Sequence, residues 1–114
     1  MNNCIFCKIA RKEIPASLVF EDDKFIAFDD IRPQAPVHTL IIPKEHIATL
    51  REASEEQAEL LGKILLRARD IARLKGIEQS GFRVVLNTGP DSGQEVFHLH
   101  FHLLGGRRLG WPPG

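Results

Sequence analysis

The chain has 114 residues, a formal net charge of +0 and 43% hydrophobic residues. This length suits one domain, so residues 1–114 are expected to form a single domain. The balanced charge argues against a nucleic-acid partner, because nucleic-acid-binding proteins normally carry an excess of Lys and Arg. The apolar runs are too short to span a bilayer, and the N-terminus lacks a signal-peptide pattern. We therefore expect a cytoplasmic protein with no membrane partner.

The first half of the sequence predicts a short helix and three strands. A helix over residues 4–12 places apolar side chains on one side. Residues 18–21 and 25–28 are two strands joined by the polar turn 22–24, which is typical of a hairpin. A strongly apolar third strand covers residues 38–42 and ends before a proline.

A long helix over residues 54–75 dominates the second half. Ser54 and Gln57 form a capping box at its start, and its apolar residues recur at helical spacing. A strand at 82–86, a loop at 87–94 and a last strand from about 96 to 104 follow. Strands on either side of one long helix predict an α+β fold with a helix covering the sheet.

The last predicted strand carries three of the five histidines of the chain. His98, His100 and His102 alternate with apolar residues, and successive strand side chains point to opposite faces. The histidines therefore share one face, while Phe97, Leu99, Phe101 and Leu103 are expected to fill a core on the other. His is not a preferred strand residue, so this register indicates a functional site.

Two chemical roles fit clustered histidines. A three-histidine catalytic zinc site is disfavoured, because His98 and His102 would lie about 13 Å apart on a regular strand. Two imidazoles about 7 Å apart suit a phosphate group better, one attacking phosphorus and one donating a hydrogen bond. The glycine-containing loop 89–94 either brings backbone N–H groups to the same anion or is an ordinary turn.

Cys4 and Cys7 are the only cysteines. A Cys-x-x-Cys pair indicates half of a metal site or a redox pair, and its place at the N-terminus, outside any strand-to-helix junction, favours metal. The other ligands of a tetrahedral zinc would then be His, Asp or Glu. The alternative is two reduced cysteines packed as small apolar groups.

Taken together, these motifs resemble histidine-triad (HIT) nucleotide-binding proteins, and specifically the Hint branch of purine nucleoside phosphoramidases. The segments that carry the resemblance are Cys4-Ile5-Phe6-Cys7, residues 30–38, residues 42–47, Asn87-Thr88-Gly89, residues 93–102 and the ending Trp111-Pro112-Pro113-Gly114.

The resemblance implies a HIT-like fold, with an antiparallel five-stranded sheet, one long helix and one short helix. It implies hydrolysis of purine nucleoside 5'-phosphoramidates through a nucleotidyl-histidine intermediate, without a catalytic cofactor. It also implies a homodimer that pairs the long helix and the adjacent sheet edge. Dinucleoside polyphosphate hydrolysis, or a nucleotide-binding regulatory or scaffold role with little turnover, are the alternatives.

The resemblance also assigns roles to residues. His100 is the expected nucleophile, His102 binds a phosphate oxygen, the His98 carbonyl holds the His100 tautomer and His38 lies nearby. A structural zinc is expected on Cys4, Cys7, His46 and His98. The expected substrate contacts are Asp30 for the ribose; Ile5, Phe6, Ile9, Phe28 and Ile31 for the base; and Asn87, Gly93, Gln94, Glu95 and Val96 around the phosphate and leaving group. The family commonly has Ser where Glu95 stands.

Overall fold

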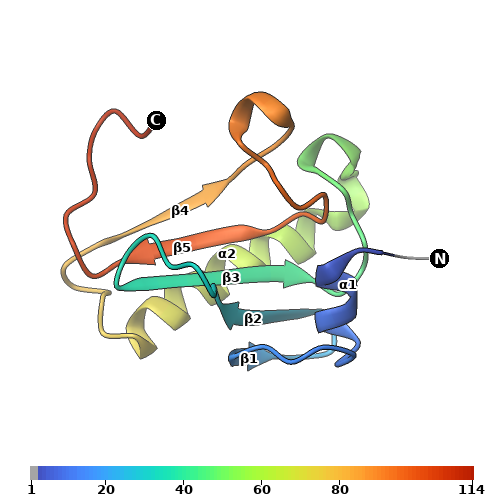
Figure 1. The fold of residues 1–114 in the computed structure, drawn as a ribbon, viewed down its shortest axis with the longest axis horizontal. Helices are drawn as coiled ribbons and strands as arrows, with labels where there is room; N and C mark the ends of the chain where they lie inside the picture. The colour runs from blue at the N-terminus through green and yellow to red at the C-terminus, as the bar shows by residue number, and fades with distance from the viewer. Residues whose placement is uncertain (1–2) are drawn as a thin grey trace.

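An antiparallel sheet in the order β1-β2-β3-β5-β4 forms the centre of the protein (Figure 1). The computed structural model describes residues 3–114. The predicted strands are confirmed, with the start of the last one corrected below, and the α+β fold with five antiparallel strands is therefore confirmed. The strands are β1 (Leu18–Glu21), β2 (Phe25–Asp29), β3 (Val37–Pro43), β4 (Phe82–Leu86) and β5 (Phe101–Gly105).

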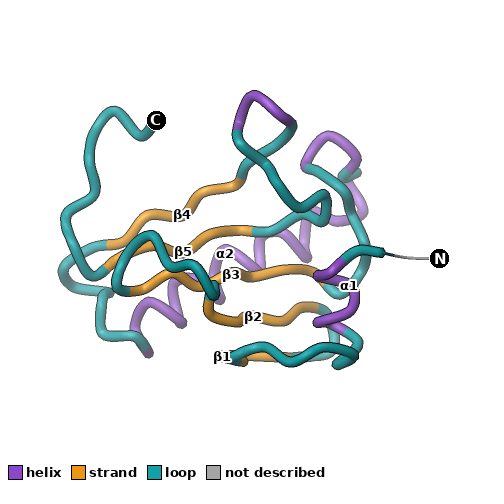
Figure 2. The backbone as a smooth tube through the Cα atoms, viewed as in Figure 1, coloured by secondary structure: helices purple, strands orange, loops and turns teal. Residues whose placement is uncertain are grey.

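The long helix α2 (Ala58–Leu74) covers one face of this sheet (Figures 1 and 2). The predicted Ser54–Gln57 capping box is present, but it begins a 3₁₀ turn at Glu55–Gln57 that leads into α2. The helix buries an apolar stripe against β2, β3 and β5, which produces the larger of two cores. No helix within residues 3–114 is long and apolar enough to cross a membrane.

The short helix α1 (Ile5–Ala10) lies on the opposite face, at the end where β3 finishes (Figure 1). It is shorter than the predicted 4–12, since Arg11 caps it and Lys12 takes a positive φ of 65°. Phe6 and Ile9 pack on the apolar side chains of β2 and β3 in a second core. A six-residue helix is not stable alone, so these contacts hold it in place.

The prediction of a regular strand from residue 96 is wrong, because β5 begins only at Phe101. Residues before it run beside residues 47–48, where Leu99 donates its N–H to the Ile47 carbonyl at 2.6 Å. The Leu99 N–H is thus bonded to a group outside the sheet. Phe97 is 47% exposed and is not a core residue, whereas Leu99, Phe101 and Leu103 are buried as expected.

Candidate active site and metal centre

His100 is held in one tautomer by the backbone. Its Nδ1 lies 2.7 Å from the carbonyl oxygen of His98. A carbonyl only accepts, so Nδ1 carries the proton and Nε2 keeps its lone pair. Burial lowers the pKa of His100, so the ring is neutral near pH 7. A neutral imidazole with a bare Nε2 is a competent nucleophile.

His102 is held in the opposite tautomer through a chain of hydrogen bonds. The N–H of Gln34 donates to His38 Nδ1 at 3.0 Å, so a neutral His38 carries its proton on Nε2. His38 Nε2 lies 2.9 Å from His102 Nδ1 and donates to it. The proton of a neutral His102 is then on Nε2, which becomes a hydrogen-bond donor.

Strand register explains why His38 and His102 meet. In the antiparallel pairing of β3 and β5, Leu40 lies opposite His102 and His38 lies opposite Leu104. His38 and His102 are therefore diagonal neighbours on one face, a spacing within reach of ring side chains. Asp30, directly after β2, places a carboxylate oxygen 3.5 Å from His38 Nε2.

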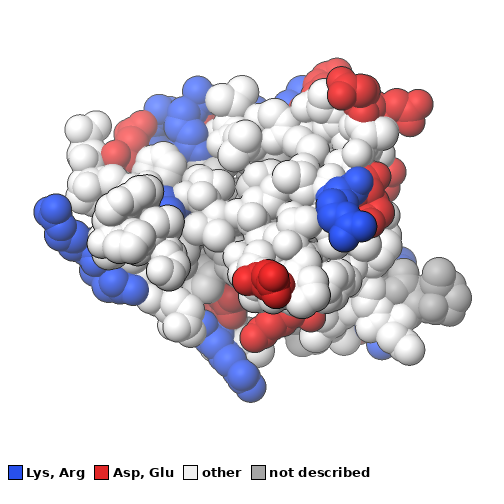
Figure 3. Space-filling model, turned by 90° about the horizontal axis from the view of Figure 1, so that it is seen from above, with Lys and Arg blue, Asp and Glu red and all other residues white. Residues whose placement is uncertain are grey.

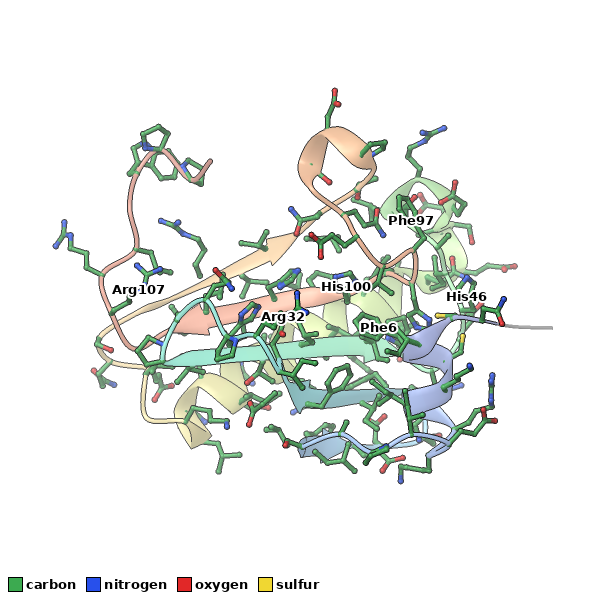
Figure 4. The ribbon with its side chains drawn as sticks, in the orientation of Figure 1. Phe6, Arg32, His46, Phe97, His100 and Arg107 are labelled. Atoms are coloured by element: carbon green, nitrogen blue, oxygen red, sulfur yellow. The ribbon has the colours of Figure 1, made fainter. Side chains whose placement is uncertain are left out.

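The five histidines and Phe6 form one connected cluster of ring contacts. Phe6 and His100 lie near each other on the α1 face of the sheet (Figure 4). The centroids of His100 and His102 are 4.9 Å apart, closer than the spacing predicted from a regular strand. Phe6 meets His100 edge-on at 5.0 Å. Burial, followed by repulsion from His100 and His38, lowers the pKa of His102 to about 4. Burial also lowers the pKa of His38, although Asp30 opposes the shift.

The structure brings together some of the residues expected to bind the base. Phe6, Ile9 and Phe28 are in one buried cluster, and Val96 packs against it. Ile5 and Ile31 are outside that cluster, with 48% and 92% of their surfaces exposed. An apolar wall therefore lies beside the histidines, with exposed apolar residues near its edge.

Among the residues expected near the phosphate, Gln94 makes hydrogen bonds to other protein groups with both atoms of its side-chain amide. Its Oε1 accepts from the Gly89 N–H at 2.8 Å, and its Nε2 donates to the carbonyls of Ala48 and Val96 at 3.0 Å each. Asn87 likewise donates to the Ser92 carbonyl. These amides brace the loop. Gly93, with a positive φ of 84°, and the exposed Glu95 belong to the same loop.

The predicted metal ligands Cys4, Cys7, His46 and His98 come together from three separate parts of the chain. Their ligand atoms all lie within 4.8 Å of one another. His98 Nδ1 is 3.3 Å from Cys4 Sγ, 3.5 Å from Cys7 Sγ and 3.2 Å from His46 Nδ1. Nitrogen ligands about 2.0–2.1 Å from a tetrahedral zinc lie about 3.3 Å apart, so the spacing fits zinc.

The tautomer of His98 gives a further test of fit. His98 is fully buried, and its Nε2 lies 2.7 Å from the Pro43 carbonyl, so Nε2 carries the proton. Its Nδ1 lone pair therefore faces the two sulfurs and His46. A metal ligand whose other ring nitrogen donates to a carbonyl is the usual arrangement, and two thiolates neutralise Zn²⁺. The expected structural zinc site is confirmed in its four ligands.

Two participants in these networks were not found from the sequence. The Gln34 N–H and the Pro43 carbonyl each fix a histidine tautomer. Both are backbone groups: every residue has a carbonyl, and every residue except proline has an N–H. Side-chain identity therefore gives no signal for them. Only the fold shows which backbone group faces which ring.

His100 and His102 have opposite tautomers and lie beside an apolar wall on an α+β sheet. This arrangement is that of a histidine-triad protein, and comparisons with known proteins agree. Residues 3–108 match the family model described as "Scavenger mRNA decapping enzyme C-term binding". The chain belongs to the HIT family.

Relatives match over nearly their whole length. A HIT family hydrolase from Legionella pneumophila Philadelphia 1 has a similar structure, with a TM-score of 0.96, 56% identity and coverage of 98% of this chain and 100% of that one. An uncharacterised HIT-like protein of Synechococcus elongatus is 58% identical, with 96% of each chain covered. A 14 kDa zinc-binding protein of Zea mays is 52% identical over 96% of this chain and 87% of its own. The chain thus has the fold of HIT family hydrolases.

Proposed function

We propose that the protein hydrolyses purine nucleoside 5'-phosphoramidates, as in the Hint branch of the family. The observation that carries this proposal is the pair of opposite tautomers at His100 and His102. One ring offers a nucleophilic lone pair and its neighbour offers an N–H. That combination suits attack on a phosphorus atom whose oxygens need a hydrogen-bond donor.

In the first half-reaction, His100 Nε2 attacks the α-phosphorus. A nitrogen–phosphorus bond forms to His100, the bond from phosphorus to the amine breaks, and the amine takes a proton from solvent as it leaves. His102 Nε2–H donates to a phosphoryl oxygen. Water then attacks the nucleotidyl-histidine, the bond from phosphorus to His100 Nε2 breaks, the water returns a proton to solvent, and the nucleoside monophosphate is released. The carbonyl of His98 keeps His100 aligned in both halves.

The surroundings of the histidines support a nucleotide substrate. Phe6, Ile9 and Phe28 provide an apolar wall for a purine base. Asp30 is part-exposed directly after β2, where its carboxylate can accept hydrogen bonds from a ribose. In this proposal Gly93 and Glu95, on the braced loop 87–96, contact the leaving group. These substrate roles are part of the proposal.

The test is a comparison of three substrates with zinc-loaded protein. We expect a fluorogenic adenosine phosphoramidate to be cleaved at least about tenfold faster than a dinucleoside tetraphosphate. A capped dinucleotide is the third substrate, because the matching family model is described by a decapping enzyme. Preferred cleavage of either phosphate anhydride would reject the phosphoramidase proposal. Nucleotide binding without turnover would favour a regulatory or scaffold role.

His100→Ala tests the nucleophile. Removing a nucleophile lowers kcat by at least about 10³-fold. The variant should still bind AMP, since His100 precedes β5 and its ring contacts the Phe6 and His102 rings without pairing the strands. Rapid acid quench and mass spectrometry of the unmodified protein should place a nucleotidyl group on His100. A nucleotidyl group on another histidine would contradict the assignment.

We also propose a homodimer built on β4 and α2. Strand β4 is at the end of the described sheet and pairs only with β5 there. Leu65 and Leu66 of α2 are 49% and 47% exposed. Viewed from the β4 side, the middle of the surface carries few charged side chains (Figure 3). Sedimentation should give twice the chain mass, and Leu65→Arg should give a monomer.

A further inference from the structure

One residue belongs to both the metal centre and the active site. The Nδ1 of His98 faces Cys4, Cys7 and His46, while the backbone carbonyl of the same residue accepts the His100 Nδ1–H at 2.7 Å. The ring is fixed from its other side by the Pro43 carbonyl. A backbone shift at His98 therefore affects both the ring that faces the metal ligands and the carbonyl that aligns His100.

Helix α1 provides a second connection. Cys4 caps this helix and Cys7 lies in it, with Phe6 between them. The Phe6 ring is 6.0 Å from His98 and 5.0 Å from His100, centroid to centroid. The helix has only six residues, so its position depends on its anchors. Two of the four metal ligands, Cys4 and Cys7, and the Phe6 ring beside the nucleophile are thus on one short helical unit.

The larger core is separate from this unit. The core between the sheet and α2 contains no residue of α1 and none of the four metal ligands. Loss of metal is therefore expected to loosen α1 and His98 while the sheet and α2 stay folded. What remains is a protein whose nucleotide site is less well ordered.

We propose that zinc binding at Cys4, Cys7, His46 and His98 and nucleotide binding at His100 are thermodynamically coupled. Zinc tightens the nucleotide site, and by reciprocity a bound nucleotide tightens the zinc site by the same factor. Couplings between sites are typically about 5–150-fold. This inference rests on the proposed function, because it takes a purine nucleotide as the ligand.

The test measures zinc affinity, not turnover. The zinc dissociation constant is determined by competition with a chelator of known affinity, with and without saturating AMP. AMP binding to the zinc-loaded protein is measured first by calorimetry. We expect AMP to lower the zinc dissociation constant at least about fivefold. If AMP binds but changes this constant less than about twofold to threefold, the coupling is overturned while the proposed function stands. If AMP does not bind at all, both are overturned.

Matched variants locate the coupling. Phe6→Leu keeps the four metal ligands but removes the aromatic contacts with His98 and His100. The factor by which AMP lowers the zinc dissociation constant should therefore fall. Phe20→Leu is the control, because Phe20 packs with Phe25 on the other core. An unchanged factor in Phe6→Leu would overturn the connection through α1. Circular dichroism of the zinc-free protein should retain the helix and sheet signals, and global unfolding would overturn the local coupling.

Discussion

His38 Nε2 lies 2.9 Å from His102 Nδ1, and this contact decides which nitrogen of His102 carries the proton. The backbone N–H of Gln34 occupies the other nitrogen of His38, so the proton between the rings belongs to His38. His102 is left with its proton on Nε2. A backbone group more than sixty positions away in the sequence thereby determines which nitrogen of His102 is a hydrogen-bond donor.

The first prediction concerns these tautomers. At pH 7.5, ¹⁵N spectra of the imidazoles should show His100 as the Nδ1–H form and His102 as the Nε2–H form, both neutral. His38→Ala should leave His100 unchanged, because its partner is the His98 carbonyl. The same variant should release His102 into a mixture of tautomers. Identical tautomers at His100 and His102 would contradict the division of roles between nucleophile and donor.

The second prediction concerns acid stability. The pKa of His102 falls from 6.5 to about 4 on folding, chiefly through burial. Above pH 6.5 both states are neutral and stability is unaffected. As the pH falls from 6.5 to about 4, the unfolded chain binds a proton that the folded chain does not, so folding loses up to about 3 kcal/mol.

Urea unfolding of the metal-loaded protein at several pH values measures this slope. In His102→Gln, the contribution of this ring is absent, so the free energy of unfolding should fall less between pH 6.5 and pH 5. A slope equal to that of the unmodified protein would mean that His102 is protonated in the folded state. Zinc content is checked at each pH, since acid also releases the metal.

The sequence predicted the fold better than it predicted the site. Hydrophobic periodicity and turn residues located every strand, and the capping box at Ser54 located the start of the long helical region, because these signals are local. The four metal ligands were also predicted, from the family resemblance. The ligand atoms of Cys4, Cys7, His46 and His98 do converge in the structure.

The sequence failed where a long-range backbone contact competes with a local pattern. The alternation from Phe97 to Leu103 indicates a continuous strand, yet Leu99 donates to Ile47 and the sheet starts at Phe101. Gln94 shows the same limit, because the resemblance implies a place near the phosphate, while the side-chain amide bonds to Gly89, Val96 and Ala48 are visible only in the fold. Which backbone groups are available near these residues is a property of the fold.

The third prediction concerns removal of zinc. Purified without chelator, the protein should hold one zinc per chain, and Cys7→Ser should hold roughly a tenth of an equivalent or less. A metal present at about 1,000 times its Kd adds about 4 kcal/mol, which corresponds to a Tm about 15 °C higher for a domain of this size. Chelator should lower the Tm of the unmodified protein but not that of Cys7→Ser. Equal effects on both would place the metal elsewhere.

The fourth prediction concerns Glu95, which stands where the Hint branch commonly has Ser. Its exposed carboxylate follows the braced Gln94 on the loop assigned to the leaving group. A negative charge there attracts a positively charged amine and repels a phosphate, each by about 1 kcal/mol at short range in water. Glu95→Ser should therefore raise kcat/KM for phosphoramidates of neutral amines and lower it for those of cationic amines.

The measurement is the ratio of kcat/KM for a cationic amine substrate to that for a neutral one of similar size. In Glu95→Ser this ratio should fall about threefold to tenfold, with AMP affinity changed less. Asp91→Ser is the matched control, because it removes an exposed carboxylate from the same loop on the 3₁₀ turn Pro90–Ser92. Raising the salt concentration should shrink the effect of Glu95→Ser, since exposed charges are screened. An equal fall in both variants would show that the loop's net charge, and not the position of Glu95, sets the amine preference.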